Sequence, residues 1–240
     1  MISSVLSGAA SVYRRLWRRS ILVAGLVFAV IALADALASR SQTFGTTFVS
    51  LVLALVGGLL VQGALVEVVR DLHEGRPPAP VATYYDRTRG RLGTLLGASL
   101  LYGIGVVAGF LLLIVPGLIA VARWALVVPL VMIERLGVRE AFGRSSQLVR
   151  GRTGRVLLLV IVVNVITSLV GVAVTVALGF LPAFAAIWLG GTIAGAVAVP
   201  YEAHVLTVLY YRLTEPERPV LPEEARDERW RSVWDEEPPA

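Results

Sequence analysis

The most restrictive feature of this sequence is a run of 46 residues, 156–201, that contains no charged side chain. A second run, 92–133, has 42 residues and a single charge, on Arg123. One helix needs about 20 apolar residues to cross the hydrocarbon of a bilayer, so each run is long enough for two crossings. Because no unpaired backbone is tolerated in lipid, each run is expected to fold back as a pair of helices.

Two shorter apolar stretches precede these runs, and the breaks VPG (115–117) and GFLP (179–182) divide the runs themselves. The composition agrees, since 56% of the residues are hydrophobic and 16% are charged, against about 45–50% and 25% in soluble domains. We therefore predict an all-α, polytopic integral membrane protein with six transmembrane helices in three hairpins. The predicted membrane domain is 1–212, with spans at 21–39, 47–69, 92–115, 117–133, 156–178 and 183–211, followed by an acidic cytoplasmic tail at 213–240.

The distribution of arginine predicts the orientation. All 22 basic residues are arginine, and 20 of them lie on one side of the predicted spans. Arg40 alone lies on the other side, and Arg123 lies within a span. Basic residues accumulate on the cytoplasmic side of membrane proteins, so we expect both termini to face the cytoplasm.

The first span has an alternative interpretation as a secretory signal. An Arg-rich start, an apolar stretch and the small residues ALAS (36–39) fit that pattern. However, Asp35 lies where a signal would be apolar, and the charged region begins only after thirteen residues. We therefore expect this helix to be retained.

Three basic segments beside the spans have a helical apolar stripe. In 137–155 the stripe is Val138, Ala141, Phe142, Ser145, Leu148 and Val149. Residues 5–17 and 79–91 show similar stripes, so we predict three interfacial amphipathic helices. Their arginines are expected to contact anionic lipid headgroups and not nucleic acid, because the segments are tethered to spans. The predicted contacts are Arg14, Arg15, Arg18, Arg19, Arg139, Arg144, Arg150, Arg152 and Arg155.

A few ionisable side chains lie inside the predicted spans, where their cost makes each one a functional candidate. They are Asp35, Glu67, Arg123, Glu202 and His204. Arg123 and Glu202 lie 11 and 10 residues from the cytoplasmic ends of their spans, which places both at a depth of about 15 Å. We predict that they pair, either as a structural contact or as part of a solute or proton path.

Two further patterns concern helix contacts and metal binding. Glu67, Asp71, Glu74 and His73 form a stripe interleaved with arginines, which favours a salt-bridged helix end over a metal site. The pairs Gly105–Gly109 and Gly191–Gly195 have the spacing of close helix contacts. We predict no metal and no cofactor.

The segment RWALVVPLVMIERLGVREAFGRSSQLVRGRTGRVL (123–157) resembles the hallmark of the bacterial membrane-domain family associated with glycerophosphoryl diester phosphodiesterases. LTVLYYRL (206–213) and AASVYRRLWRR (9–19) resemble that family's closing and opening motifs. The resemblance implies a six-span fold in the bacterial inner membrane. Some members carry a phosphodiesterase domain, and because these 240 residues contain none, we do not expect that activity here.

The sequence carries no catalytic signature: HExxH, GxSxG, the dinucleotide glycine fingerprint and the phosphate loop are all missing. We therefore expect a non-enzymatic membrane protein, such as a scaffold or a lipid-associated factor, that could bind a membrane protein or a second copy. The alternative is a transporter or channel-like carrier of a small or lipidic solute that uses Arg123 and Glu202. A polar cavity at mid-depth would favour transport, and a dry, close-packed bundle would favour a scaffold.

Overall fold

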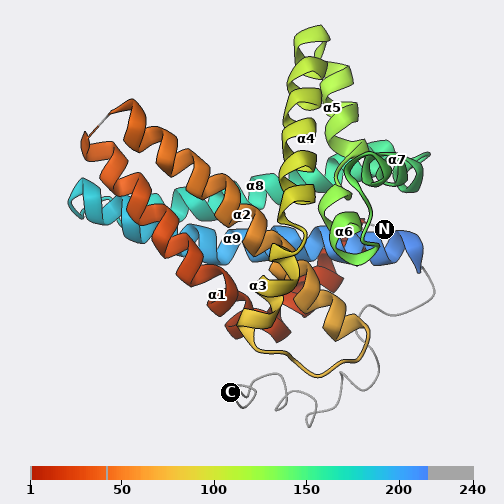
Figure 1. Cartoon of the computed structure of the whole chain (residues 1–240), viewed down its shortest axis with the longest axis horizontal. Helices are drawn as coiled ribbons and strands as arrows, with labels where there is room; N and C mark the ends of the chain where they lie inside the picture. Colours follow the sequence, from red (N-terminus) through yellow and green to blue (C-terminus); the bar gives the residue numbers. More distant parts are fainter. Residues whose placement is uncertain (1, 42, 216–240) are drawn as a thin grey trace.

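The computed structural model describes residues 2–41 and 43–215 (Figure 1). The predicted acidic tail beyond residue 215 lies outside the described residues. Within the described ranges the chain forms helices and no strand. In chain order the helices are α1 (Ile2–Ser41), α2 (Phe44–His73), α3 (Val81–Arg89), α4 (Leu92–Leu112), α5 (Ile114–Arg123), α6 (Val127–Ile133), α7 (Val138–Val149), α8 (Thr153–Ala177) and α9 (Ala183–Thr214).

The described chain has six segments that are long and apolar enough to cross a membrane. They are α1, α2, α4, α5 together with α6, α8 and α9. This number and order match the six predicted spans. The fourth span differs from the prediction because it consists of two helices with a turn between them.

Helix α1 continues without a break through the predicted amphipathic segment and the first span. The stripe Val5, Ala9, Val12 and Leu16 is buried in the protein core, and α1 makes its most extensive contact with α9. The stripe was therefore placed on the correct face, but the prediction of a separate interfacial helix is wrong here. The apolar stripe of α1 packs against other helices of the protein and not against lipid.

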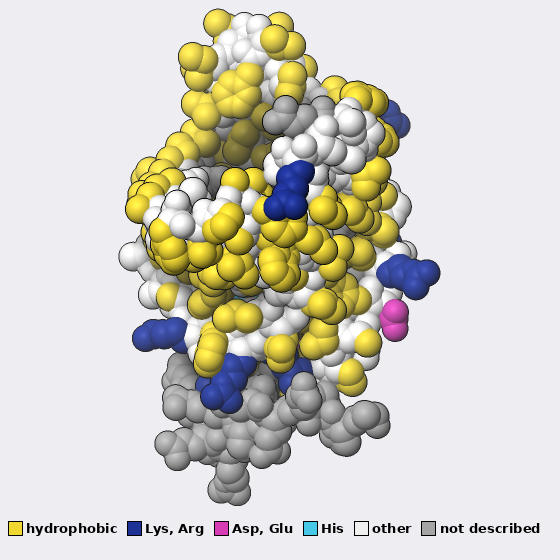
Figure 2. All heavy atoms as spheres, turned by 90° about the vertical axis from the view of Figure 1, so that its left-hand side faces the viewer, with side chains coloured by type: hydrophobic (Ala, Val, Ile, Leu, Met, Phe, Trp, Pro, Cys, Tyr) yellow, Lys and Arg dark blue, Asp and Glu magenta, His cyan; other side chains and the backbone are white. Residues whose placement is uncertain are grey.

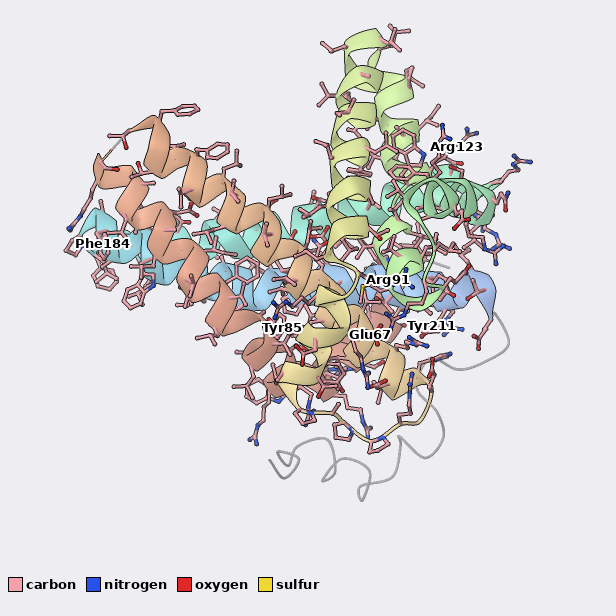
Figure 3. The ribbon with its side chains drawn as sticks, in the orientation of Figure 1. Glu67, Tyr85, Arg91, Arg123, Phe184 and Tyr211 are labelled. Atoms are coloured by element: carbon pink, nitrogen blue, oxygen red, sulfur yellow. The ribbon has the colours of Figure 1, made fainter. Side chains whose placement is uncertain are left out.

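The spans are arranged in two groups (Figure 1). Helices α1, α2, α8 and α9 pack together, whereas α4 and α5 extend away from them as a pair. We call the end of the molecule that carries segments 74–91 and 134–152 the basic end, because both segments are rich in arginine. The opposite ends of α1 and α9 meet where the Arg40 guanidinium lies 4.4 Å from the centroid of the Phe184 ring (Figure 3).

Two glycine contacts bring helices unusually close. A Cβ on Gly109 of α4 would lie 2.9 Å from the Cα of Gly117 of α5, and a Cβ on Gly195 of α9 would overlap the Phe28 ring of α1. The close contacts predicted from the two glycine pairs are therefore confirmed. Outside these contacts, hydrophobic side chains cover most of the face shown in Figure 2.

Helix α7 has the predicted apolar stripe, with Ala141, Phe142, Ser145 and Val149 buried. The stripe faces the protein, since α7 packs against α6, α4 and α5. Periodicity therefore identified the buried face of α7 correctly. That face is covered by other helices of the protein and not by lipid.

Candidate functional site

The fourth span is interrupted at residues 124–126, between α5 and α6. The buried Ser145 hydroxyl of α7 bridges this break: it donates to the Arg123 carbonyl at 2.6 Å and accepts from the Leu126 N–H at 3.3 Å. Pro129 has no N–H to donate to the Ala125 carbonyl one turn earlier. The chain therefore keeps a non-helical turn inside the membrane because another helix satisfies its backbone.

A pocket of about 810 Å³ lies beside this break. Its lining comes from α2, α4, α8, α9 and the segment from α5 to α6. Most of the walls are apolar side chains, including Leu118, Val165 and Val172. A volume of this size is typical of sites for small molecules, about 300–1,000 Å³.

Four polar side chains from four helices line the pocket at a similar depth, and we call them the polar layer: Gln62, Tyr102, Asn164 and Glu202. Gln62 lies 11 residues before the end of α2, and Glu202 lies 12 before the end of α9. Tyr102 lies 10 residues after the start of α4, and Asn164 lies 11 after the start of α8. Each is therefore about 15–18 Å along its helix from the basic end.

The structure does not pair Arg123 with Glu202. Arg123 is exposed at the end of α5 and does not line the pocket (Figure 3). Glu202 is half-buried in the pocket and makes no ion pair or side-chain hydrogen bond with any residue in the described ranges. The prediction failed because a count of residues gives depth along a helix and not the direction in which the side chain points.

Two other predicted candidates have structural contacts. His204 is completely buried, with Nε2 3.4 Å from the Ser20 hydroxyl of α1 and its ring in edge contact with Tyr13. Asp35 accepts a hydrogen bond from the Ser50 hydroxyl, which joins α1 to α2. Neither residue lines the pocket.

The fifth candidate, Glu67, lies in an ion-pair cluster at the basic end. It is 1% exposed and contacts Arg70 and Arg87 at 3.5 Å and Arg135 at 3.2 Å. Asp71, one turn further along α2, contacts Arg87 at 2.9 Å. The cluster joins α2 to α3 and to the segment after α6, as a salt-bridged helix end predicts. No cluster suited to a metal ion occurs among residues 2–41 and 43–215.

Helix α3 and the segment just before it are joined to α1 by two hydrogen bonds. The Tyr85 hydroxyl donates to the Val23 carbonyl, and burial raises the pKa of Tyr85 to about 12, so the phenol keeps its proton. Arg19 donates to the Ala79 carbonyl at 2.8 Å and is only 7% exposed. The prediction that Arg19 contacts lipid headgroups is therefore wrong.

The other predicted headgroup arginines differ in exposure. Arg15 is partly buried, and Arg144 forms an ion pair with Glu134 at 3.4 Å. The side chains exposed at the surface are Arg14, Arg18, Arg139, Arg144, Arg150, Arg152 and Arg155. Their contact with lipid stays a prediction.

Sequence analysis missed most of the polar layer and the role of Ser145. A signal was present for three of these residues. Gln62 and Asn164 are the amide side chains of their apolar stretches, and Ser145 is a polar residue on an otherwise apolar stripe. A buried polar group needs a partner, but the sequence does not show which helix supplies it.

Six apolar spans and a pocket between them define a polytopic integral membrane protein with a membrane-embedded site. Residues 95–212 match the family described as the membrane domain of glycerophosphoryl diester phosphodiesterase. This range includes the motif at 123–157 that resembles the same family. The match covers all the pocket-lining helices except α2. No curated protein and no solved structure gives a significant match.

Proposed function

We propose that this protein is a non-enzymatic carrier of an amphipathic, lipid-like solute in the bacterial inner membrane, with its basic end in the cytoplasm. The observation that carries the proposal is the polar layer inside an apolar pocket. The apolar walls suit a hydrocarbon chain, and the polar layer suits the head of the same molecule.

The depth of the polar layer favours a carrier over a site for a resident lipid. A lipid at rest keeps its head at the membrane surface, whereas the polar layer lies about 15–18 Å along the helices from the basic end, inside the apolar part of the spans. Polar groups at that depth are costly, and they stabilise a head group that crosses the membrane. Interrupted helices at mid-depth are also typical of the substrate sites of transporters.

The scaffold interpretation has less support. It predicts a close-packed centre, but the α4–α5 pair diverges from the other spans beside a pocket of about 810 Å³. The exposed arginines of α7, such as Arg139 and Arg144, suit anionic headgroups at about 1 kcal/mol per well-placed residue. That contact would orient the protein in the membrane under either interpretation.

A bulky side chain in the pocket should block the carrier. Ser168 lines the pocket from α8, so Ser168→Trp fills space that the solute needs. In vesicles reconstituted with the protein, we expect this variant to slow the movement of a lipid between leaflets by about tenfold or more, the effect of losing roughly 1.4 kcal/mol of favourable binding in the carrier. The probe is phosphatidylethanolamine with a nitrobenzoxadiazole label on one acyl chain, and the readout is its bleaching by external dithionite.

Leu158→Trp is the matched control, because Leu158 is exposed on the same helix and does not line the pocket. The control should keep the wild-type rate. Equal rates for the two tryptophan variants, or a wild-type rate no faster than that of protein-free vesicles, would contradict the proposed carrier.

A further inference from the structure

We infer that the pocket selects an amphiphile with a cationic head group, such as an alkylammonium, and that Glu202 is the residue that sets this preference. The inference rests on the proposed function, because it names the chemical class of the solute that the pocket carries. The argument uses the charge, the hydrogen-bonding groups and the aromatic rings of the pocket.

The described lining of the pocket contains an acidic side chain and no basic one. Glu202 is the acidic residue of the lining, and no arginine belongs to the lining formed by the described residues. A carboxyl group in a poorly solvated site either binds a proton or needs a compensating charge to ionise. The described residues supply no such charge within ion-pair distance of Glu202. A cation on the ligand would supply it, whereas an anionic head would meet a like charge.

The neutral groups of the pocket add hydrogen-bond acceptors. The Asn164 amide nitrogen donates one hydrogen bond to the Val160 carbonyl at 2.9 Å, and its side-chain oxygen accepts none from the described residues, so it is available as an acceptor. Ala125 is also a lining residue, and its carbonyl receives no N–H from Pro129. Both groups favour a head that donates hydrogen bonds or carries positive charge.

Two aromatic rings of the lining support the same ligand class. Tyr102 and Trp124 lie edge to face with ring centroids 6.4 Å apart, and both line the pocket with Glu202. The faces of tyrosine and especially tryptophan attract quaternary ammonium groups through cation–π interactions. A carboxyl group and two aromatic rings in the lining of one pocket are therefore suited to an ammonium head.

Trp124 provides a reporter inside the pocket. A variant that retains Trp124 as its sole tryptophan, with Trp17, Trp188, Trp230 and Trp234 changed to Phe, would be reconstituted in phosphatidylglycerol vesicles, which contain no competing ammonium. Bromine on the chain of an added amphiphile quenches tryptophan at contact. The probes share one dibrominated C18 chain and carry a trimethylammonium, a hydroxyl or a sulfate head. A second variant that retains only Trp188, exposed on α9, corrects for partition into the bilayer.

We expect the trimethylammonium probe to quench Trp124 at concentrations about tenfold lower than the hydroxyl probe, after correction, because its positive charge is attracted to the carboxylate and to the aromatic faces, whereas the hydroxyl head is uncharged. Glu202→Gln should remove this preference, since the amide keeps the shape of the side chain and loses its charge. The concentration at which the hydroxyl probe quenches Trp124 should stay within about twofold of the value for the unsubstituted residue. Glu202→Asp keeps the charge and should keep the preference.

The outcomes separate the two proposals. If all three probes quench Trp124 beyond the Trp188 control but without a head-group preference, or if Glu202→Gln leaves the preference intact, the inference about Glu202 is wrong and the pocket still binds amphiphiles. If no probe quenches Trp124 beyond that control, the proposed carrier function fails as well.

Discussion

Replacement of Glu67 by glutamine lowers the free energy of unfolding by about 3 kcal/mol, which is one of the two largest effects that we expect from a single substitution. Glu67 is 1% exposed and contacts three arginines from three segments of the chain. Glutamine keeps the size of the side chain but removes the charge that the three guanidinium groups share. Arg87 and Arg70 keep Asp71 and Glu74 as partners, whereas Arg135 loses its ion pair. We place the effect at the low end of the usual range because the arginines are 22–38% exposed and water screens part of the loss.

The measurement is unfolding in detergent micelles with increasing sodium dodecyl sulfate, followed by circular dichroism. Glu74→Gln is the matched control, because Glu74 lies two turns further along, at the end of α2, and pairs with Arg70 and Arg76 while 35% exposed. A solvent-exposed pair contributes at most about 1 kcal/mol. Equal, small effects for Glu67→Gln and Glu74→Gln would show that the ion-pair cluster does not hold α2, α3 and the segment after α6 together.

Replacement of Ser145 by alanine has the second large effect, and this effect is local to the break in the fourth span. The substitution leaves the Arg123 carbonyl and the Leu126 N–H without their common partner. Each buried polar group that loses its hydrogen bond costs about 1–3 kcal/mol, so we expect a total of about 2–4 kcal/mol. Hydrogen exchange should report this directly, because the Leu126 amide would exchange about 30-fold or more faster if the break opens more easily by about 2 kcal/mol.

The adjacent residue provides the control for this experiment. Ser146 is half-buried, and its side chain makes no hydrogen bond in the part of the chain that the structure describes. Ser146→Ala should therefore leave both stability and exchange at Leu126 close to the wild type. If Ser145→Ala and Ser146→Ala behave alike, α7 does not stabilise the break.

Much of the fold could be predicted from the sequence, because a bilayer imposes strong constraints on composition. The uncharged run 156–201 requires two crossings of the membrane, and the structure places α8 and α9 there. The stripe at 5–17 gave the correct buried face of α1. It did not give the partner, since periodicity shows that one face avoids water but not whether protein or lipid covers it.

The candidate site could be predicted only in part. Glu202 was found because a charge in a long apolar span is conspicuous. The prediction that Arg123 pairs with Glu202 was wrong, because the turn at 124–126 ends α5 and leaves the Arg123 side chain exposed. The polar layer consists of single residues on four different helices, so it exists only once the helices pack. No spacing of residues within the sequence indicates that these four side chains come together.

Photo-crosslinking from the pocket tests the central claim most directly. Benzoylphenylalanine would replace Ser168, which lines the pocket, or Leu158, which is exposed on the same helix and does not. After irradiation in cells, the mass of the adduct identifies the captured molecule. The proposed carrier predicts that position 168 is enriched in one class of amphiphile that position 158 does not select. The same mixture of bulk lipids at both positions would contradict it, because the pocket would then hold no solute of its own.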